Sequence, residues 1–218
     1  DLARIVEGVV YRDHLVDRGI LPVVSTASLV SFRAGPGALE PVRANGLAPA
    51  DIACIPAAAG GPKGLALLPL DRLLYREWLR SPGLSIELMG ASVGAWRMAA
   101  LAQPDPLAAL DRLQHAYVRD QNYAEKPGPQ DVAEAITRIA LAVLDGQALE
   151  VREGVALTVI TSRARGPLHG RESKLAFARA TLSNAWSRAR LATYLERVLF
   201  VAGRPGFLAG PFDEFGLV

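Results

Sequence analysis

Hydrophobic residues recur along this chain in two patterns, and each pattern predicts a different kind of element. Spacing of three to four residues predicts helices, whereas short apolar runs bounded by turn residues predict buried strands. Helices are predicted over residues 2–18, 65–79, 95–102, 105–123 and 131–146, with one or two more within 171–199. Strands are predicted over 52–56, 84–89, 155–161 and 199–202, with extended runs at 20–24 and 29–32 and a loop over 34–49.

The order of these elements predicts the fold class. Strands that alternate with helices are typical of an α/β fold, here a three-layer α/β/α sandwich with a largely parallel central sheet. Local signals mark some helix ends: Asp105 is a predicted N-cap, Asp131 and Glu134 resemble a capping box, and Gly146 a stop. We expect one domain over residues 1–218, incomplete at its C-terminus, with the core motifs within 51–165.

Composition narrows the class of protein. Half of the 218 residues are hydrophobic and 21% are charged, so the chain can bury a substantial core. No apolar run reaches the ~18 residues that would span a bilayer. The single cysteine, Cys54, lies in an apolar run and excludes an internal disulfide framework. We interpret it as a small buried hydrophobic residue.

Charge is unevenly distributed along the chain. Residues 1–150 carry a net charge of −3 and residues 151–218 a net charge of +5, and arginine outnumbers lysine 21 to 3. Arginine binds phosphates and anionic head groups well, but it is also an ordinary surface residue in an arginine-rich chain. Aromatic residues are few and not interleaved with the basic ones, so we expect no nucleic-acid partner.

The basic segment 171–199 has two interpretations. Five apolar residues lie near helical spacing, with arginines and a lysine between them: Leu175, Leu182, Trp186, Leu195 and Val198. A basic amphipathic helix can dock on an anionic lipid interface, and a stripe of this kind can equally pack onto its own domain.

A G-x-S-x-G pattern carries the clearest chemical signal. Gly90, Ser92 and Gly94 follow the predicted strand 84–89 and precede the predicted helix 95–102. This is the context of a nucleophile elbow, in which the serine sits on a sharp turn above the sheet edge. The flanking glycines allow the strand and helix backbones to pack closely. We interpret Ser92 as a nucleophile.

A glycine-rich segment precedes the elbow by about thirty residues. The sequence AGGPKG occupies 59–64, after one predicted strand and before a predicted helix. It lacks the spacing of a phosphate-binding P-loop. Backbone N–H groups in such a turn can stabilise an oxyanion, whereas alone the segment would be a plain strand-to-helix turn.

Together the two motifs resemble those of the patatin-like phospholipases, across residues 51–102 and more loosely to about residue 165. The family pattern is G-G-G-x-[KR]-G followed by G-x-S-x-G, so Gly64 matches its last loop glycine. Ala59 departs from the pattern, which a turn tolerates where φ is negative. Pro62 has no N–H, so the resemblance implies oxyanion donors at Gly60 and Gly61. Lys63 would either steer a substrate phosphate toward the serine or be a solvated side chain.

The catalytic base is the weakest point of the resemblance. The family uses a Ser–Asp dyad with the aspartate in a D-G-[GAS] turn, but Asp145-Gly146 precedes Gln147 and fits the end of a helix. Asp213 lies at a plausible distance in the wrong motif, and we expect the dyad aspartate beyond Val218. A Ser-His-Asp triad would instead use His169, whereas His115 lies mid-helix and His14 precedes the elbow by far.

These observations predict a serine acyl hydrolase that acts on lipid esters, without a metal or cofactor. The alternatives are an acyltransferase on the same scaffold and a non-catalytic lipid-binding domain that lacks its base. The expected partners are a lipid ester and, peripherally, an anionic membrane. The expected location is cytoplasmic or peripheral to a membrane.

Overall fold

The computed structural model describes residues 34–120, 127–168, 174–186 and 188–203. The predicted elements at 2–18, 20–24 and 29–32 lie outside these residues. The chain divides into two compact units, residues 1–51 and 52–218, and each is considered by itself.

The described part of the first unit is helical, so the predicted loop over 34–49 is wrong. Helix α3 spans Pro36–Asn45, and a short 3-10 helix, η2, spans Pro49–Asp51. Gly35 is the N-cap of α3 and Pro36 is its first residue. Proline is tolerated there because the N–H at this position has no hydrogen-bond partner within a helix. Gly46, with φ of 76°, ends it. The turn signals at 35–37 are therefore those of a helix start.

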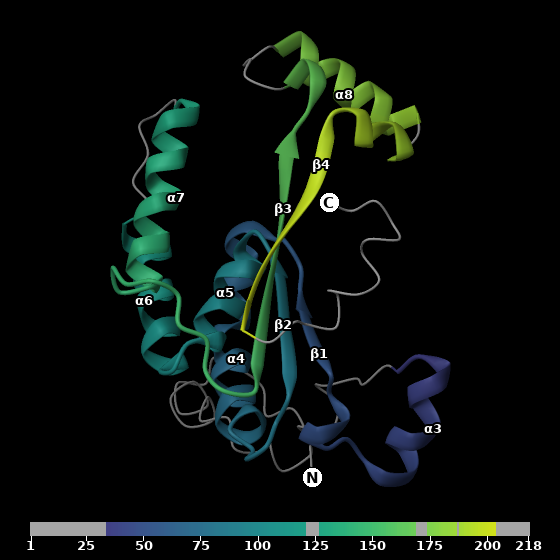
Figure 1. The fold of residues 1–218 in the computed structure, drawn as a ribbon, viewed down its shortest axis with the longest axis vertical. Helices are drawn as coiled ribbons and strands as arrows, with labels where there is room; N and C mark the ends of the chain where they lie inside the picture. Colours follow the sequence, from purple (N-terminus) through teal and green to yellow (C-terminus); the bar gives the residue numbers. More distant parts are fainter. Residues whose placement is uncertain (1–33, 121–126, 169–173, 187, 204–218) are drawn as a thin grey trace, which may run out of the picture. The chain divides into compact units, whose positions relative to one another are not determined.

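A four-stranded sheet organises the second unit, in the order β1-β2-β3-β4 (Figure 1). The first three strands run parallel, and β4 pairs antiparallel with β3. Their bounds are β1 Cys54–Ala57, β2 Ile86–Ala91, β3 Val155–Ala164 and β4 Leu195–Gly203. The predicted strands are confirmed in position, and their ends differ from the prediction by at most four residues.

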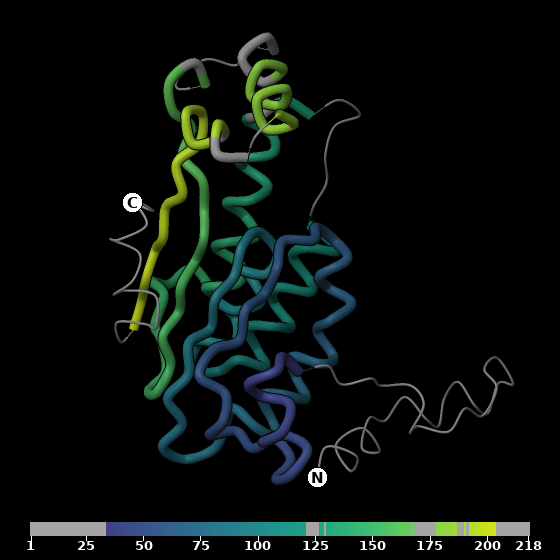
Figure 2. The backbone as a smooth tube through the Cα atoms, turned by 90° about the vertical axis from the view of Figure 1, so that its right-hand side faces the viewer, coloured from purple at the N-terminus to yellow at the C-terminus, as the bar shows by residue number. Residues whose placement is uncertain are grey.

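Helices pack in succession on one face of this sheet. Helix α5 lies on β2 and β3, α6 packs on α5, and α7 packs on α6 (Figure 1). In Figure 2 the strands lie side by side and these helices are behind them. The bounds are η3 Gly61–Leu67, α4 Leu68–Leu74, a π-helical turn η4 Tyr75–Leu79, α5 Val93–Ala102, α6 Pro106–Arg119 and α7 Pro129–Val143. The core lies between helices and sheet, where Leu88, Met98, Leu110 and Leu157 are fully buried.

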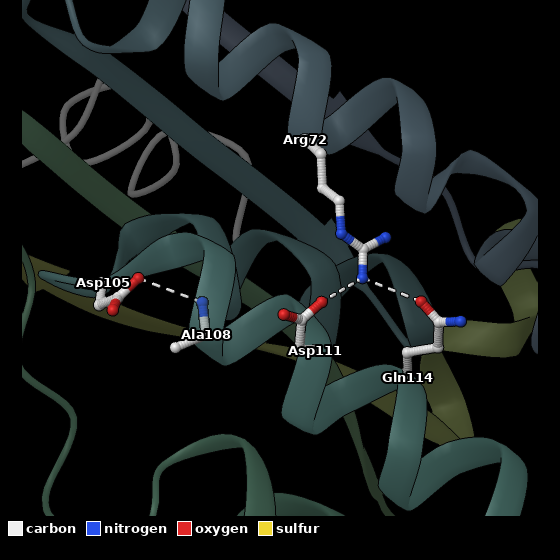
Figure 3. Close-up of polar contacts among 5 residues, drawn as sticks. All are labelled: Arg72, Asp105, Ala108, Asp111 and Gln114. Carbon is white, nitrogen blue, oxygen red and sulfur yellow. Dashed lines mark hydrogen bonds and ion pairs between the residues drawn. The ribbon is translucent and has the colours of Figure 1, made fainter. Parts of the chain in front are cut away.

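Polar contacts fix the ends and the mutual placement of these helices. Asp105 accepts a hydrogen bond from the N–H of Ala108 (3.1 Å), which confirms it as the N-cap of α6 (Figure 3). Arg72 of α4 donates to Asp111 (2.6 Å) and Gln114 (2.9 Å) of α6. The start of α7 corrects the predicted capping box: Asp131 is not the cap but the third helical residue, accepting from the N–H of Gly128.

The segment 171–199 is only partly helical. Helix α8 spans Lys174–Trp186, a 3-10 helix η6 spans Arg188–Thr193, and β4 begins at Leu195. Leu195 and Val198 therefore lie in a strand, and the predicted helical stripe that included them is wrong. The apolar residues from 195 onward pair with β3, whose β-branched sequence offers a long edge.

The fold is thus α/β, with a mostly parallel four-stranded sheet, as the alternation of elements predicts. Within the described residues, no helix is long and apolar enough to cross a membrane.

Candidate active site

Ser92 stands at the sharp turn between strand β2 and helix α5. Its backbone has φ of 54° and ψ of −130°, a combination that costs a residue with a Cβ about 1–3 kcal/mol. The side chain is exposed. Its carbonyl accepts the first bonds of α5, from the N–H groups of Ala95 (2.9 Å) and Trp96 (3.3 Å). The predicted elbow is therefore present: a strained, exposed serine at the carboxyl edge of a parallel sheet.

The two motif glycines allow this turn because backbones pass too close for a side chain. A Cβ on Gly90 would lie 2.5 Å from the carbonyl of Gly94. A Cβ on Gly94 would lie 2.3 Å from the carbonyl oxygen of Ala57 at the end of β1. Real Cβ atoms do not approach backbone so closely. The glycines therefore permit close packing of β1, β2 and α5, as the sequence predicts.

The glycine-rich loop packs directly against the elbow. A Cβ on Gly64 would lie 2.5 Å from Cγ1 of Val93, the residue after Ser92. Gly61 has φ of 56°, a left-handed conformation that favours glycine, whereas Ala59 does not have positive φ. An alanine is therefore tolerated at position 59, as the sequence predicts for a turn with negative φ. Gly64 and Val93, 29 positions apart in the sequence, thus pack together and join the loop to the elbow.

Several backbone donors gather around this contact. Within the described part of the chain, the N–H groups of Gly60 and Gly61 make no hydrogen bond, and neither do those of Val93 and Gly94 in the first turn of α5. Unpaired N–H groups and the helix dipole make a helix start attractive to an anion. Lys63 is exposed on η3 and has no ion-pair partner among the described residues.

A buried ion pair that the sequence did not predict joins the helices that follow the two motifs. Arg97 of α5 donates two hydrogen bonds of 2.6 Å to the two carboxylate oxygens of Asp71 on α4. Both side chains are almost fully buried. Since α4 continues the glycine-rich loop and α5 begins after Ser92, this pair positions the loop relative to the serine. No sequence motif marks it, because the two residues are far apart in the chain.

The Asp145-Gly146 turn ends α7, as predicted. Asp145 and Gly146 have φ of 54° and 68°, and the N–H of Gly146 donates to the carbonyl of Leu141 (2.8 Å). Arg112 donates both to the carbonyl of Val143 and to Gln103, the residue that ends α5. Ser92 begins α5, about 15 Å away at 1.5 Å per residue. This aspartate therefore lies near the C-terminal end of α5, the end opposite Ser92.

The other base candidates are placed as follows. Asp213, His169 and His14 lie outside the described residues. His115 is exposed on α6. No carboxylate or imidazole hydrogen-bonds to Ser92 in the described part of the chain, and no group of three His, Cys, Asp or Glu there could hold a metal ion.

Cys54 belongs to a polar cluster on the sheet face opposite α5. Glu87 is buried there and accepts a hydrogen bond from the hydroxyl of Thr158 (2.6 Å). Cys54 pairs with Glu87 across β1 and β2. Burial, and secondarily the charge of Glu87, raise the pKa of the Cys54 thiol. The thiol is only half-buried, but it is kept protonated and poorly nucleophilic.

A cleft of about 430 Å³ lies at the amino edge of the sheet, far from Ser92. It is lined by residues around Ser81–Ser85 and by Arg152. That arginine donates to the carbonyls of Leu79 and Leu101 and lies 5.6 Å from the ring centre of Tyr75. Arg152 thus satisfies carbonyl groups at the C-terminal ends of η4 and α5 and ties these two ends together.

A comparison of this chain with protein-family models, with curated proteins and with solved structures finds no match.

Proposed function

We propose that this protein is a serine acyl hydrolase of patatin-like type, with a three-layer α/β/α fold and a lipid ester as substrate. The observation that carries the proposal is the strained, exposed Ser92 beside a loop with unpaired backbone donors. A structural turn has no need of a serine with a φ of 54°, since glycine adopts that conformation without strain.

The chemistry follows from these groups. Ser92 Oγ attacks the ester carbonyl and gives its proton to a base, forming a tetrahedral oxyanion. N–H groups of Gly60 and Gly61, with that of Val93, would hold this oxyanion, each well-placed donor contributing ~3–4 kcal/mol. The carbon–oxygen bond to the alcohol then breaks, and the alcohol takes up the proton. Water hydrolyses the resulting acyl-enzyme and restores Ser92.

The base is proposed from outside the described residues. A carboxylate fits the resemblance to the Ser–Asp enzymes, and Asp213 is the residue to test first, with His169 as the triad alternative. Lys63, exposed beside the loop, is proposed to attract a substrate phosphate.

Ester hydrolysis by matched serine variants tests the proposal. Ser85 precedes β2 and Ser92 follows it, and both are exposed. With p-nitrophenyl esters, the Ser92→Ala variant is expected to lose activity to a few per cent or less, whereas Ser85→Ala retains it. Equal activity of Ser92→Ala and the parent protein contradicts the proposal. No hydrolysis by the folded parent favours the non-catalytic lipid-binding domain.

The acyltransferase alternative shares Ser92 and the acyl-enzyme. Adding an acceptor alcohol separates the two reactions, because a transferase forms the new ester in preference to the free acid. A hydrolase forms mainly free acid.

A further inference from the structure

The antiparallel pair of strands β3 and β4 extends beyond the edge of the sheet at which Ser92 lies. Ala91, the last residue of β2, pairs with Ile160 of β3, and β3 continues for four more residues to Ala164. At about 3.3 Å per residue, this strand pair projects roughly 13 Å beyond the end of β2. Figure 1 shows α8 at the end of this projection. We call residues 161–168, 174–186 and 188–198 the distal arm.

The distal arm exposes an apolar pair on α8. Ala180 faces inward, packed with Leu168, Ala164, Tyr194 and Leu195. Leu182 and Trp186 are one helical turn apart on another side, with 70% and 82% of their surfaces exposed. Arg179 precedes them on the same stripe, since positions i, i+3 and i+7 share a helix face. A tryptophan left this open is unusual for a residue that is mostly buried in soluble domains.

The distal arm is also strongly basic. Its described residues include seven arginines or lysines and a single acid, Glu196. Arg163 and Arg165 pair with Glu196 while their own side chains stay 64% and 53% exposed. The hydrogen bond from Arg165 lowers the pKa of Glu196, so this acid stays ionised near neutral pH. One carboxylate therefore holds two arginines at the surface, and no other ion pair joins the residues that the structure describes in the arm.

We propose that the distal arm docks on an anionic lipid surface. Leu182 and Trp186 would enter the boundary between head groups and acyl chains, where tryptophan is favoured, while Arg179, Arg190 and the paired arginines contact anionic head groups. A second copy of the chain is a poorer occupant, because it would bring the same positive charge to the contact. Since the arm projects from the edge that carries Ser92, docking brings that edge to the lipid. This last point rests on the proposed function.

Vesicle co-sedimentation of the purified protein tests the docking without relying on turnover. The parent is expected to bind vesicles of phosphatidylcholine with phosphatidylglycerol and to bind pure phosphatidylcholine much more weakly. Leu182→Ser with Trp186→Ser should reduce binding to the anionic vesicles roughly tenfold or more, because the buried apolar area is lost. Arg179→Gln with Arg190→Gln should remove the preference for the anionic lipid.

A matched control is available on α7. Val132 and Ile136 are also exposed and one turn apart, but acidic residues flank them on a different helix. Val132→Ser with Ile136→Ser is expected to leave vesicle binding unchanged. All four substituted apolar residues are exposed, so circular dichroism should show the same fold in each variant.

The outcomes separate this proposal from the proposed function. Ser92→Ala should bind vesicles like the parent, and the Leu182/Trp186 double variant should still hydrolyse a water-soluble short-chain ester if Ser92 is catalytic. The docking proposal is overturned if the folded parent does not bind anionic vesicles, or if the Leu182/Trp186 variant binds them as well as the parent. Binding to RNA but not to vesicles also overturns it.

Discussion

The buried pair between Arg97 and Asp71 allows a quantitative test of how the scaffold of the candidate site is held. The guanidinium donates two parallel bonds of 2.6 Å, and the side chains are only 7% and 2% exposed. Arg97→Met removes the cation and leaves the Asp71 carboxylate buried without its partner. Breaking a buried pair in this way costs about 3–5 kcal/mol.

A matched control comes from the ion pair between α4 and α6. Arg72 and Asp111 are the same residue types at the same separation of 2.6 Å, but Asp111 is 71% exposed (Figure 3). Water can solvate that carboxylate once the arginine is gone, so Arg72→Met should cost about 1 kcal/mol or less. The comparison isolates the effect of burial.

Urea denaturation followed by circular dichroism measures both costs. With a slope of about 2 kcal/mol per molar urea, Arg97→Met should lower the midpoint by roughly 1.5–2.5 M, and Arg72→Met by about 0.5 M or less. The double variant Asp71→Leu with Arg97→Met removes both buried charges and should recover most of the loss. This variant also keeps the test informative if the single one does not fold. Equal costs for the two single variants, or a double variant as unstable as Arg97→Met, would refute the reasoning.

Three further predictions concern the elbow and the opposite sheet face. Gly64→Ala should lower both stability and esterase activity because the new Cβ would clash with Val93. Adding Val93→Ala should restore part of each, as thermal melting and ester assays can check. If the second substitution restores neither, the contact is contradicted. Ser92→Gly should raise the free energy of unfolding by about 0.5–2 kcal/mol, since strain is relieved, whereas Ser92→Ala should not; equal effects in urea denaturation contradict the strain. Cys54 should react with iodoacetamide at pH 8 more slowly than a free thiol of pKa ~8.5, because its raised pKa leaves less of it as thiolate at that pH. Equal reaction rates of the native and the unfolded protein would contradict this prediction.

The sequence was informative wherever local rules decide the structure. The elbow could be predicted because glycines are required two positions before and two positions after Ser92, and the backbone distances at Gly90 and Gly94 show why. The cap at Asp105 and the turn at Asp145 are likewise decided by neighbouring residues.

The misses have physical causes of two kinds. Pro36 between two glycines fits a loop and a helix start equally well, and in the structure it is the start of helix α3. Residues 195–199 have an apolar pattern that also fits a helix, but pairing with β3 decides their conformation, and periodicity does not show that pairing. The Arg97–Asp71 pair depends on tertiary contact alone.

The central claim is that Ser92 is an activated nucleophile, and covalent labelling tests it most directly. The purified protein is treated with a fluorophosphonate, and the adduct is located by intact and peptide mass spectrometry, with Ser92→Ala and Ser85→Ala as controls. The account predicts one adduct, on Ser92, which disappears in Ser92→Ala and persists in Ser85→Ala. A folded protein that takes no label, or takes it equally at Ser85 and Ser92, would contradict the account.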